Sequence, residues 1–306
     1  SLILAPCADE EHGGRYGFGW MAEHHPEKLA APYAVNEGGG VPIEAAGNLT
    51  YLLGIGEKGR LQLEIEVRGS SAHASTPWQG NNALFGLSEV VRRIVAYEAE
   101  LDPSPSLFDH LSTFAIEDKP SPENIDQIIA DNEESQPRFA SIMKALSRMT
   151  ITPTMIQGGI KSNSVPESVK LTCDVRTLPH QDEAYVRQEL GNILDGIPGV
   201  EIDIDYMSIP NASPFETEFA QRIQISTANA LNRDDIQWVP SLSPGFTDSR
   251  FTRNLGTTTY GMVGSHPDDD PMISFVHGTN ESVGIRSLIS GTRIMLALAY
   301  DLLAVK

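Results

Sequence analysis

Three consecutive acidic residues, Asp9, Glu10 and Glu11, stand at the end of a short apolar run and are followed by a pair of glycines. The apolar run, residues 2–5, is typical of a strand buried on both faces of a parallel sheet. Open α/β sheets bind their ligands at the carboxyl ends of such strands. Adjacent carboxylates repel each other in a partly closed site unless a cation or a shared proton intervenes. The run therefore indicates a metal site, although the same acids also suit the first turn of a solvated helix.

A second carboxylate occupies a similar place further along the chain. Glu37 follows the short apolar stretch 33–35 and precedes three glycines. Glu11 and Glu37 are 26 residues apart, which suits one strand–helix–strand step of a parallel sheet. We therefore expect the two carboxylates to be neighbours at one sheet edge.

A histidine in the last loop of the chain completes a ligand set of the kind that zinc prefers. His277 lies in a polar stretch just before the expected closing helix at residues 285–303. A lone loop histidine is usually a surface residue, but imidazole together with carboxylates binds zinc, and a hydrolytic zinc needs three protein ligands and a water. We predict Glu11, Glu37 and His277 as metal ligands. Glu10, beside a ligand but not one itself, is then the candidate general base.

Three polar residues in the middle of the chain suit a substrate with a free carboxylate. An imidazole at His73 can stabilise an oxyanion, and Asn163 and Arg176 can bind a carboxylate through paired hydrogen bonds. Arg176 also has a purely structural alternative, an ion pair with Asp174 or Glu167.

These candidates fall in segments with two different hydrophobic patterns. Residues 61–68 alternate strictly between apolar and polar, which predicts a half-exposed strand of an antiparallel sheet. The expected order after it is helix, strand, strand, helix, strand, the split-βαβ arrangement, at residues 82–98, 154–157, 169–176, 182–195 and 200–206. The Pro-, Ser- and acid-rich residues 101–149 are expected to form loops and short helices inserted in this domain.

The remaining segments again have the pattern of an α/β domain, with helices expected at 215–231 and 285–303 and a strand at 257–263. The predicted fold is thus an α/β catalytic domain with a parallel-type mixed sheet, interrupted by a smaller α+β domain. We place the catalytic domain at 1–58 and 211–306 and the inserted domain at 59–210. Because the chain opens inside the acid-tipped strand, we expect the catalytic domain to be incomplete at its N-terminus.

Composition limits the classes of partner. The chain has 306 residues, 40% of them hydrophobic, which is enough for two domains with cores of their own. A net charge of −19 argues against nucleic acid as a partner. No run approaches the roughly 20 apolar residues that cross a bilayer, so we expect no membrane segment. The two cysteines, Cys7 and Cys173, indicate no disulfide framework, and we expect a cytoplasmic location.

Seven ordered blocks of the sequence resemble one family, the M20 metallopeptidases, which include carboxypeptidases, aminoacylases, acetylornithine deacetylases and succinyl-diaminopimelate desuccinylases. The likeness covers nearly all of the chain. The blocks are residues 9–14, 36–39, 69–77, 158–166, 174–179, 245–248 and 277–281. The long insertion at residues 101–149 and the sequence of residues 246–250 are closer to the carboxypeptidase and aminoacylase branch than to the desuccinylases.

The resemblance assigns roles to the metal-site residues. It implies that Glu10 is the general base, that Glu11 and His277 hold one zinc ion and that Glu37 holds a second, with cobalt or manganese as substitutes. The inserted domain would be the lid and dimerisation domain of a homodimer. Exposed strand edges at residues 61–68 or 154–157 would suit pairing across a two-fold axis.

The resemblance also assigns the substrate contacts. It implies that His73 enters the active site of the partner subunit and polarises the scissile carbonyl. Asn163 and Arg176 would contact the substrate carboxylate, and the loop that contains Gly245 and Thr247 would border the substrate. The implied activity is hydrolysis of an amide bond next to a free carboxylate, in a dipeptide, a short peptide or an N-acyl amino acid.

One departure from the family concerns the metal site. The family's His-x-Asp ligand motif and its bridging Asp precede the acidic block and are absent from these residues. We therefore predict a two-zinc hydrolase in the intact protein, whereas this chain by itself should be metal-poor and inactive. The alternative is an M20-like dimerisation or binding protein, or a fragment, that lacks a complete metal site.

Overall fold

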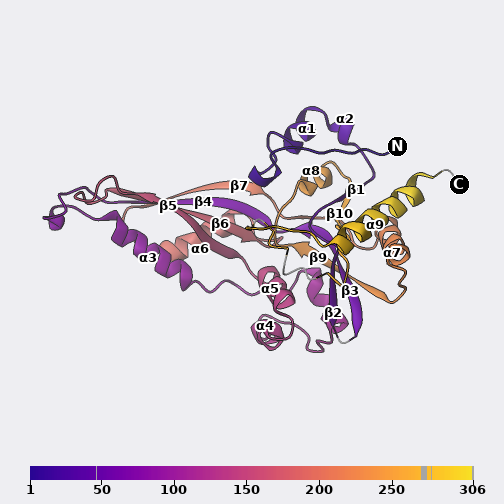
Figure 1. Ribbon diagram of the computed structural model, residues 1–306. Helices are drawn as coiled ribbons and strands as arrows, with labels where there is room; N and C mark the ends of the chain where they lie inside the picture. The colour runs from indigo at the N-terminus through magenta and orange to yellow at the C-terminus, as the bar shows by residue number, and fades with distance from the viewer. Residues whose placement is uncertain (46, 270–273, 277, 305–306) are drawn as a thin grey trace. The chain divides into compact units, whose positions relative to one another are not determined.

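Two compact units make up the chain in the computed structural model, which describes residues 1–45, 47–269, 274–276 and 278–304 (Figure 1). Unit 1 consists of Ser1–Glu57, Asp102–Leu146 and Asn211–Lys306. Unit 2 consists of Lys58–Leu101 and Ser147–Pro210.

Unit 2 is a four-stranded sheet whose antiparallel strands follow the predicted alternation. Strand β4 (Gly59–Arg68) buries every second side chain along its length. The sheet order is β5-β6-β4-β7, with β5 at Thr150–Gly158, β6 at Ser168–Thr177 and β7 at Val200–Ser208. A strand with one buried face and one solvent-exposed face produces this pattern.

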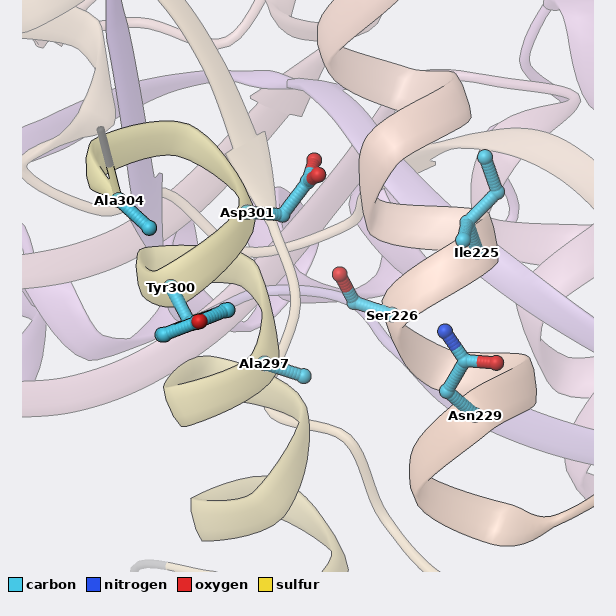
Figure 2. Close-up of a pocket in the computed structure, with 7 residues that line it drawn as sticks. All are labelled: Ile225, Ser226, Asn229, Ala297, Tyr300, Asp301 and Ala304. Atoms are coloured by element: carbon cyan, nitrogen blue, oxygen red, sulfur yellow. The ribbon is translucent and has the colours of Figure 1, made fainter. Parts of the chain in front are cut away.

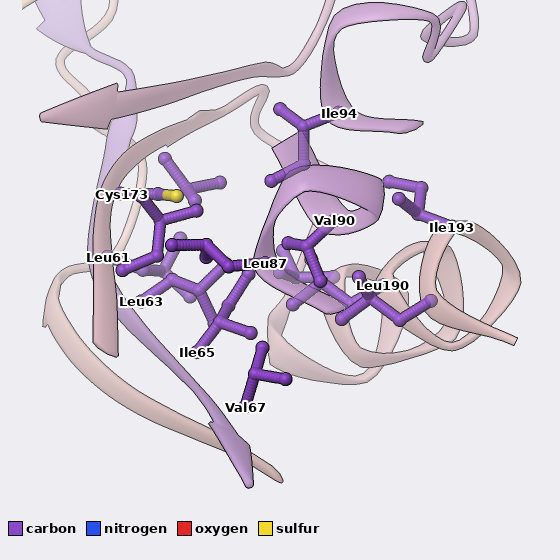
Figure 3. Close-up of a cluster of buried hydrophobic side chains, with 14 of the residues drawn as sticks. Leu61, Leu63, Ile65, Val67, Leu87, Val90, Ile94, Cys173, Leu190 and Ile193 are labelled. Carbon is purple, nitrogen blue, oxygen red and sulfur yellow. The ribbon is translucent and has the colours of Figure 1, made fainter. Parts of the chain in front are cut away.

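Two helices cover the apolar face of that sheet. Helix α3 (Ala83–Val95) and helix α6 (Glu183–Leu194) direct Leu87, Val90 and Leu190 into the cluster that contains the buried side chains of β4 (Figure 3). Each helix begins at a capping residue, since the side chain of Asn82 or Asp182 accepts a hydrogen bond from a main-chain N–H of the first turn. The expected order of strands and helices is confirmed.

Only one of the two strand edges considered for dimerisation is an edge. Strand β4 pairs with β6 on one side and with β7 on the other, so the expectation of an exposed edge at residues 61–68 is wrong. Strand β5 pairs only with β6 among the described strands, and its Met155 and Ile156 are exposed. Alternation alone does not distinguish the two cases because it reports exposure of a face and not of an edge.

The sheet of unit 1 is mixed, as predicted, and is centred on β3 (Asn48–Glu57). Strand β3 is buried along nearly all its length and pairs antiparallel with β2 (Val41–Ala45), β8 (Asn211–Ala212) and β10 (Thr258–Gly261). It runs parallel to β9 (Ile236–Ser243), and β1 (Tyr33–Asn36) runs parallel to β10. The sequence does not predict β2, β3 or β9.

Helices α7 (Glu218–Leu231) and α9 (Ile285–Leu303) pack against each other in unit 1, as Figure 1 shows, and confirm two predicted helices. The rings of Tyr33, Phe219 and Tyr260 stack in series and join α7 to β1 and β10. The other short helices near the N-terminus and in the later loops are η1 (Glu10–His12), α1 (Phe18–His24), α2 (Pro26–Leu29), η2 (Pro77–Gln79) and α8 (Ser249–Asn254). In the described part of the chain, no helix combines the length and hydrophobicity that a bilayer span requires.

The segment 102–146 belongs to unit 1, whereas the expected boundaries place it within the inserted domain 59–210. It forms η3 (Ser106–Phe114), α4 (Ile125–Glu133) and α5 (Pro137–Leu146). The reason is packing, since η3 buries Leu107 and Phe108 and contacts β2, β3 and β9 of unit 1.

The expected buried strand at residues 2–5 is also not found. Residues 1–7 have no regular secondary structure, and Leu2, Ile3 and Leu4 are exposed. No described strand runs alongside them, so their main-chain groups have no ladder to join.

A lysine is fully buried in unit 2. Lys58 is 0% exposed, and its Nζ donates a hydrogen bond to the main-chain carbonyl of Arg148 at 2.7 Å. Burial lowers the pKa of Lys58 to about 7, and the nearby charges of Arg176 and Arg148 lower it further in the same direction.

This pKa makes stability depend on pH. An unfolded lysine has a pKa of about 10.4, so between roughly pH 7 and 10 the unfolded chain binds a proton that the folded chain does not. The free energy of unfolding should therefore gain a few kcal/mol across this range, whereas below about pH 7 the buried charge opposes folding in full.

Urea unfolding from pH 6.5 to 9.5 tests the assignment. Lys58→Met should flatten the rise, and Lys170→Met, which removes a half-exposed lysine paired with Glu64 at 2.6 Å, should keep it. Equal slopes in the wild type and Lys58→Met would contradict the assignment.

Candidate active site

Glu10 and Glu11 lie on a one-turn helix, and the main chain turns sharply at both of its ends. Helix η1 is preceded by Asp9 at φ 73° and followed by Gly13 and Gly14 at φ 99° and 63°. The amides of Gly13 and Gly14 donate to the carbonyls of Glu10 and Asp9 at 2.9 and 2.7 Å. The Asp9 carboxylate accepts a hydrogen bond from the Tyr16 amide at 2.9 Å. The left-handed flanks close this turn (residues 9–14) and hold Glu10 and Glu11 within it.

Glu37 lies immediately after the carboxyl end of β1, as the sequence predicts. The main chain that follows packs directly against two neighbouring strands, since a Cβ on Gly39 would collide with the Gly261 carbonyl and the Gly54 amide. Only glycine permits this approach. The triple glycine therefore fixes the position of Glu37 at the sheet edge.

Glu10, Glu37 and Asp248 influence one another electrostatically. Burial raises the pKa of Glu10 to about 7, and the charges of Glu37, Asp248 and Glu11 raise it as well, while Arg250 lowers it. Burial likewise raises the pKa of Asp248 to about 6, against the opposing effect of Arg250. The predicted residues Glu11 and Glu37 thus both lie within electrostatic range of Glu10.

Asp248 was not among the residues predicted for the site, although it lies in a block of the family resemblance. It is 7% exposed, and its Oδ1 has no hydrogen-bond partner among the described residues. Asp248 lies so close to Gly14 that a Cβ on that glycine would collide with it. The sequence does not reveal this contact because 234 residues separate the two.

The predicted substrate loop at Gly245 and Thr247 is held mainly by internal contacts. Thr247 is 5% exposed, and its Oγ1 donates to Glu57 Oε1 at 2.5 Å and lies 2.8 Å from Ser249 Oγ. The Gly245 amide donates to Ser243 Oγ at 3.2 Å. The Thr247 hydroxyl therefore stabilises the loop from within.

Acidic oxygens of this kind, including the unpartnered Asp248 Oδ1, fit a divalent cation by charge and donor chemistry. A complete coordination group is not present in the part of the chain that the structure describes, where no three His, Cys, Asp or Glu side chains are placed to hold a metal ion. The predicted ligand His277 lies outside the described residues.

In unit 2 the structure places His73 beside Asn163. The Ala74 amide donates to the Asn163 carbonyl at 3.0 Å, and His73 forms a β-bridge with Ser164. The Ser75 amide donates to His73 Nδ1 at 3.2 Å, so Nδ1 acts as acceptor and Nε2 carries the hydrogen of a neutral ring. An exposed Nε2–H is the donor that oxyanion stabilisation requires.

Arg176 lies far from that pair and forms the alternative ion pair. Its Nε and Nη2 donate to the two carboxylate oxygens of Asp174 at 2.5 and 3.1 Å, and Arg60 shares the same carboxylate at 3.1 Å. Asn163 precedes β6 and Arg176 is near its end, and the strand alone spans about 26 Å from Ser168 to Arg176 at roughly 3.3 Å per residue. One chain cannot bring both to a single carboxylate.

The described surface also has a hollow of about 420 Å³ between α7 and α9, which contains none of the predicted residues. Figure 2 shows Ile225, Ser226 and Asn229 of α7 opposite Tyr300 and Asp301 of α9. The Asp301 carboxylate accepts a hydrogen bond from Arg222 at 2.5 Å, so its charge is used structurally.

Comparisons with known proteins find relatives in sequence and in fold. The family model described as the peptidase dimerisation domain matches residues 55–199. The human N-fatty-acyl-amino acid synthase/hydrolase PM20D1 is 23% identical over 98% of this chain and 61% of its own length, and carboxypeptidase S of Saccharomyces cerevisiae is 24% identical over 98% and 59%. The structure of an M20 family metallo-carboxypeptidase, Sso-CP2 of Sulfolobus solfataricus, shares the fold, with a TM-score of 0.63 at 17% identity over 95% of this chain and 68% of that one. The chain spans about three fifths of the length of these two curated relatives.

The contact between Gly14 and Asp248 gives a prediction for stability. Gly14→Ala adds a Cβ at a left-handed position where it collides with Asp248 and lies 3.1 Å from Phe251. Gly256→Ala is the matched control, because Gly256 has φ 86° and nothing within 4 Å of its Cβ position.

The control should lose about 1 kcal/mol of unfolding free energy from backbone strain. Gly14→Ala should lose a further 1–3 kcal/mol, approximately, from overpacking. Equal urea midpoints for the two variants would show that the turn and Asp248 are not in contact.

Proposed function

We propose that the protein is a hydrolase that cleaves an amide bond next to a free carboxylate. Its chain belongs to the M20 metallopeptidase family. The proposed substrates are dipeptides, the C-termini of short peptides and N-acyl amino acids. The observation that carries the proposal is the meeting of Glu10, Glu37 and Asp248, which come from three separate segments of unit 1. The names of the two relatives, a hydrolase of N-fatty-acyl amino acids and a carboxypeptidase, support this substrate class.

The proposed cofactor is zinc. Glu11 and His277 would hold one ion and Glu37 a second, since carboxylate and imidazole are ordinary zinc ligands. When bound, zinc supplies Lewis-acid polarisation of the scissile carbonyl.

Glu10 is proposed to move the proton. It shares the 9–14 turn with the proposed ligand Glu11, so its carboxylate would lie near the metal without being a ligand. It would accept a proton from the attacking water and return it to the leaving amine, the two transfers that amide hydrolysis requires.

A second subunit is proposed to complete the site through unit 2. Because His73 and Asn163 share one corner of that unit, they would enter the partner's site together, His73 Nε2–H donating to the oxyanion and Asn163 to the substrate carboxylate. Arg176 would bind that carboxylate from the other chain. The exposed edge of β5 is a suitable surface for the homodimer, since an unpaired edge favours pairing with a second copy.

Substitution of the proposed base tests the mechanism. Glu10→Gln keeps the size of the side chain and removes the proton acceptor, so kcat should fall by roughly a hundredfold or more while KM changes little. Glu23→Gln is the matched control because Glu23 is an exposed carboxylate on α1. The assay uses N-acetyl amino acids and dipeptides with added zinc or cobalt, on the complete product of the gene in parallel with this chain. Activity that survives Glu10→Gln would remove Glu10 from the mechanism.

Metal content tests the cofactor separately. We expect the 306-residue chain to remain metal-poor and inactive after dialysis against zinc, and the complete product to retain two zinc ions, measured by inductively coupled plasma mass spectrometry. Tight binding of two zinc ions by the 306-residue chain would contradict this expectation. A complete product without metal or activity would favour the alternative of a dimerisation or binding protein.

A further inference from the structure

An arginine connects the turn that carries Glu10 to the loop that carries Thr247. Arg250 is 4% exposed, although guanidinium groups are rarely buried without partners. Its Nη1 donates to the Thr247 carbonyl at 2.8 Å, and its Nη2 donates to the Gly13 carbonyl. Two main-chain carbonyls that are 234 residues apart in sequence are thus bound by one planar group.

Aromatic rings hold that guanidinium in place. Its Cζ lies 4.7 Å from the centroid of the Phe246 ring and 4.3 Å from that of Phe251. The Phe251 ring in turn stacks on Phe18 of α1, with centroids 6.3 Å apart and planes inclined by 13°. A flat group between rings keeps its donors in one direction, which a flexible lysine does not do.

The 9–14 turn needs support from outside. Asp9 has a left-handed conformation, which aspartate adopts less freely than glycine, and the turn contains only a few hydrogen bonds of its own. A charge-assisted hydrogen bond from Arg250 to the Gly13 carbonyl fixes its far end.

The other end of the connection is held independently. The Thr247 side chain already contacts Glu57 and Ser249, and the Ser249 amide donates to Thr247 Oγ1 at 3.0 Å. Loss of Arg250 would therefore loosen the 9–14 turn far more than the Thr247 loop.

We propose that Arg250 is a positioning residue that holds the 9–14 turn, and with it the carboxylate of Glu10, against the Thr247 loop. The structural part of this inference concerns the turn alone, and its catalytic consequence rests on the proposed function. Arg250 acts through the main chain of Gly13 and does not need to touch the substrate.

Hydrogen exchange measured by mass spectrometry tests the structural part on the 306-residue chain. Arg250→Met should speed exchange in peptides covering residues 9–19 at least tenfold. Arg250→Lys, which keeps the charge but cannot span two carbonyls, should show most of that increase.

The matched control is Arg253→Met. Arg253 lies on the same helix with its side chain 5% exposed, but it contacts Glu57 and Asn211 and donates to the Thr259 carbonyl, and none of these belongs to the turn. Exchange in residues 9–19 should stay within threefold of the wild type in this variant. Unchanged exchange in both Arg250 variants, or an equal increase in Arg253→Met, would overturn the proposal. If Arg250→Met does not fold, Arg250→Lys against Arg253→Met decides.

Kinetics on the complete product test the catalytic consequence. A displaced base should lower kcat of Arg250→Lys at least tenfold and change KM less than threefold, whereas loss of a substrate contact would raise KM. A kcat equal to the wild type in Arg250→Lys would mean that only the charge matters and would overturn the positioning role. If the wild type has no amidase activity, the proposed function fails, and the exchange result still decides whether Arg250 holds the turn.

Discussion

Negative charge held partly out of water is the constraint around which unit 1 is built. Burial raises the pKa of Glu10 and of Asp248, and the charges of neighbouring carboxylates raise both further, with Glu57 acting on Asp248 as well. Ionised carboxylates in such a place are unstable unless cations or hydrogen-bond donors compensate for the lost water. Arg250 lowers both of those pKa values, and Arg253 pairs with Glu57 at 3.5 Å. Carboxylate oxygens gathered in this way suit a divalent cation by charge and donor chemistry.

Much of unit 2 could be predicted from the sequence because its patterns are local. One face of the sheet is covered by two helices, so residues 61–68 and 169–176 alternate with a period of two, and the helices show their own apolar stripes. The helix predicted at 285–303 has these bounds in the structure for a similar reason, since it follows a glycine and has a regular apolar face. A pattern of this kind needs no knowledge of the partner surface.

The centre of unit 1 could not be predicted in the same way. Strand β3 is buried on both faces, so its residues show no alternation, and Gly54 and Gly56 interrupt an already short apolar run. The place of Asp248 beside Gly14 depends on a contact between distant segments, as does the packing of residues 102–146 on unit 1. The sequence therefore indicates candidate acids but not what surrounds them, because the surroundings are set by tertiary packing and not by spacing.

The length of β6 constrains how one carboxylate can be bound. His73 and Asn163 lie together before the strand begins, and Arg176 is near its far end, about 26 Å along the strand from Ser168. A dipeptide spans only about 7 Å between its ends, so no small substrate bridges that distance. If Asn163 and Arg176 both bind the same substrate carboxylate, they must come from different chains, and His73 must arrive with Asn163 because the two share a corner of unit 2. The requirement for two subunits then follows from a rigid strand, whatever the strength of the contact between the subunits.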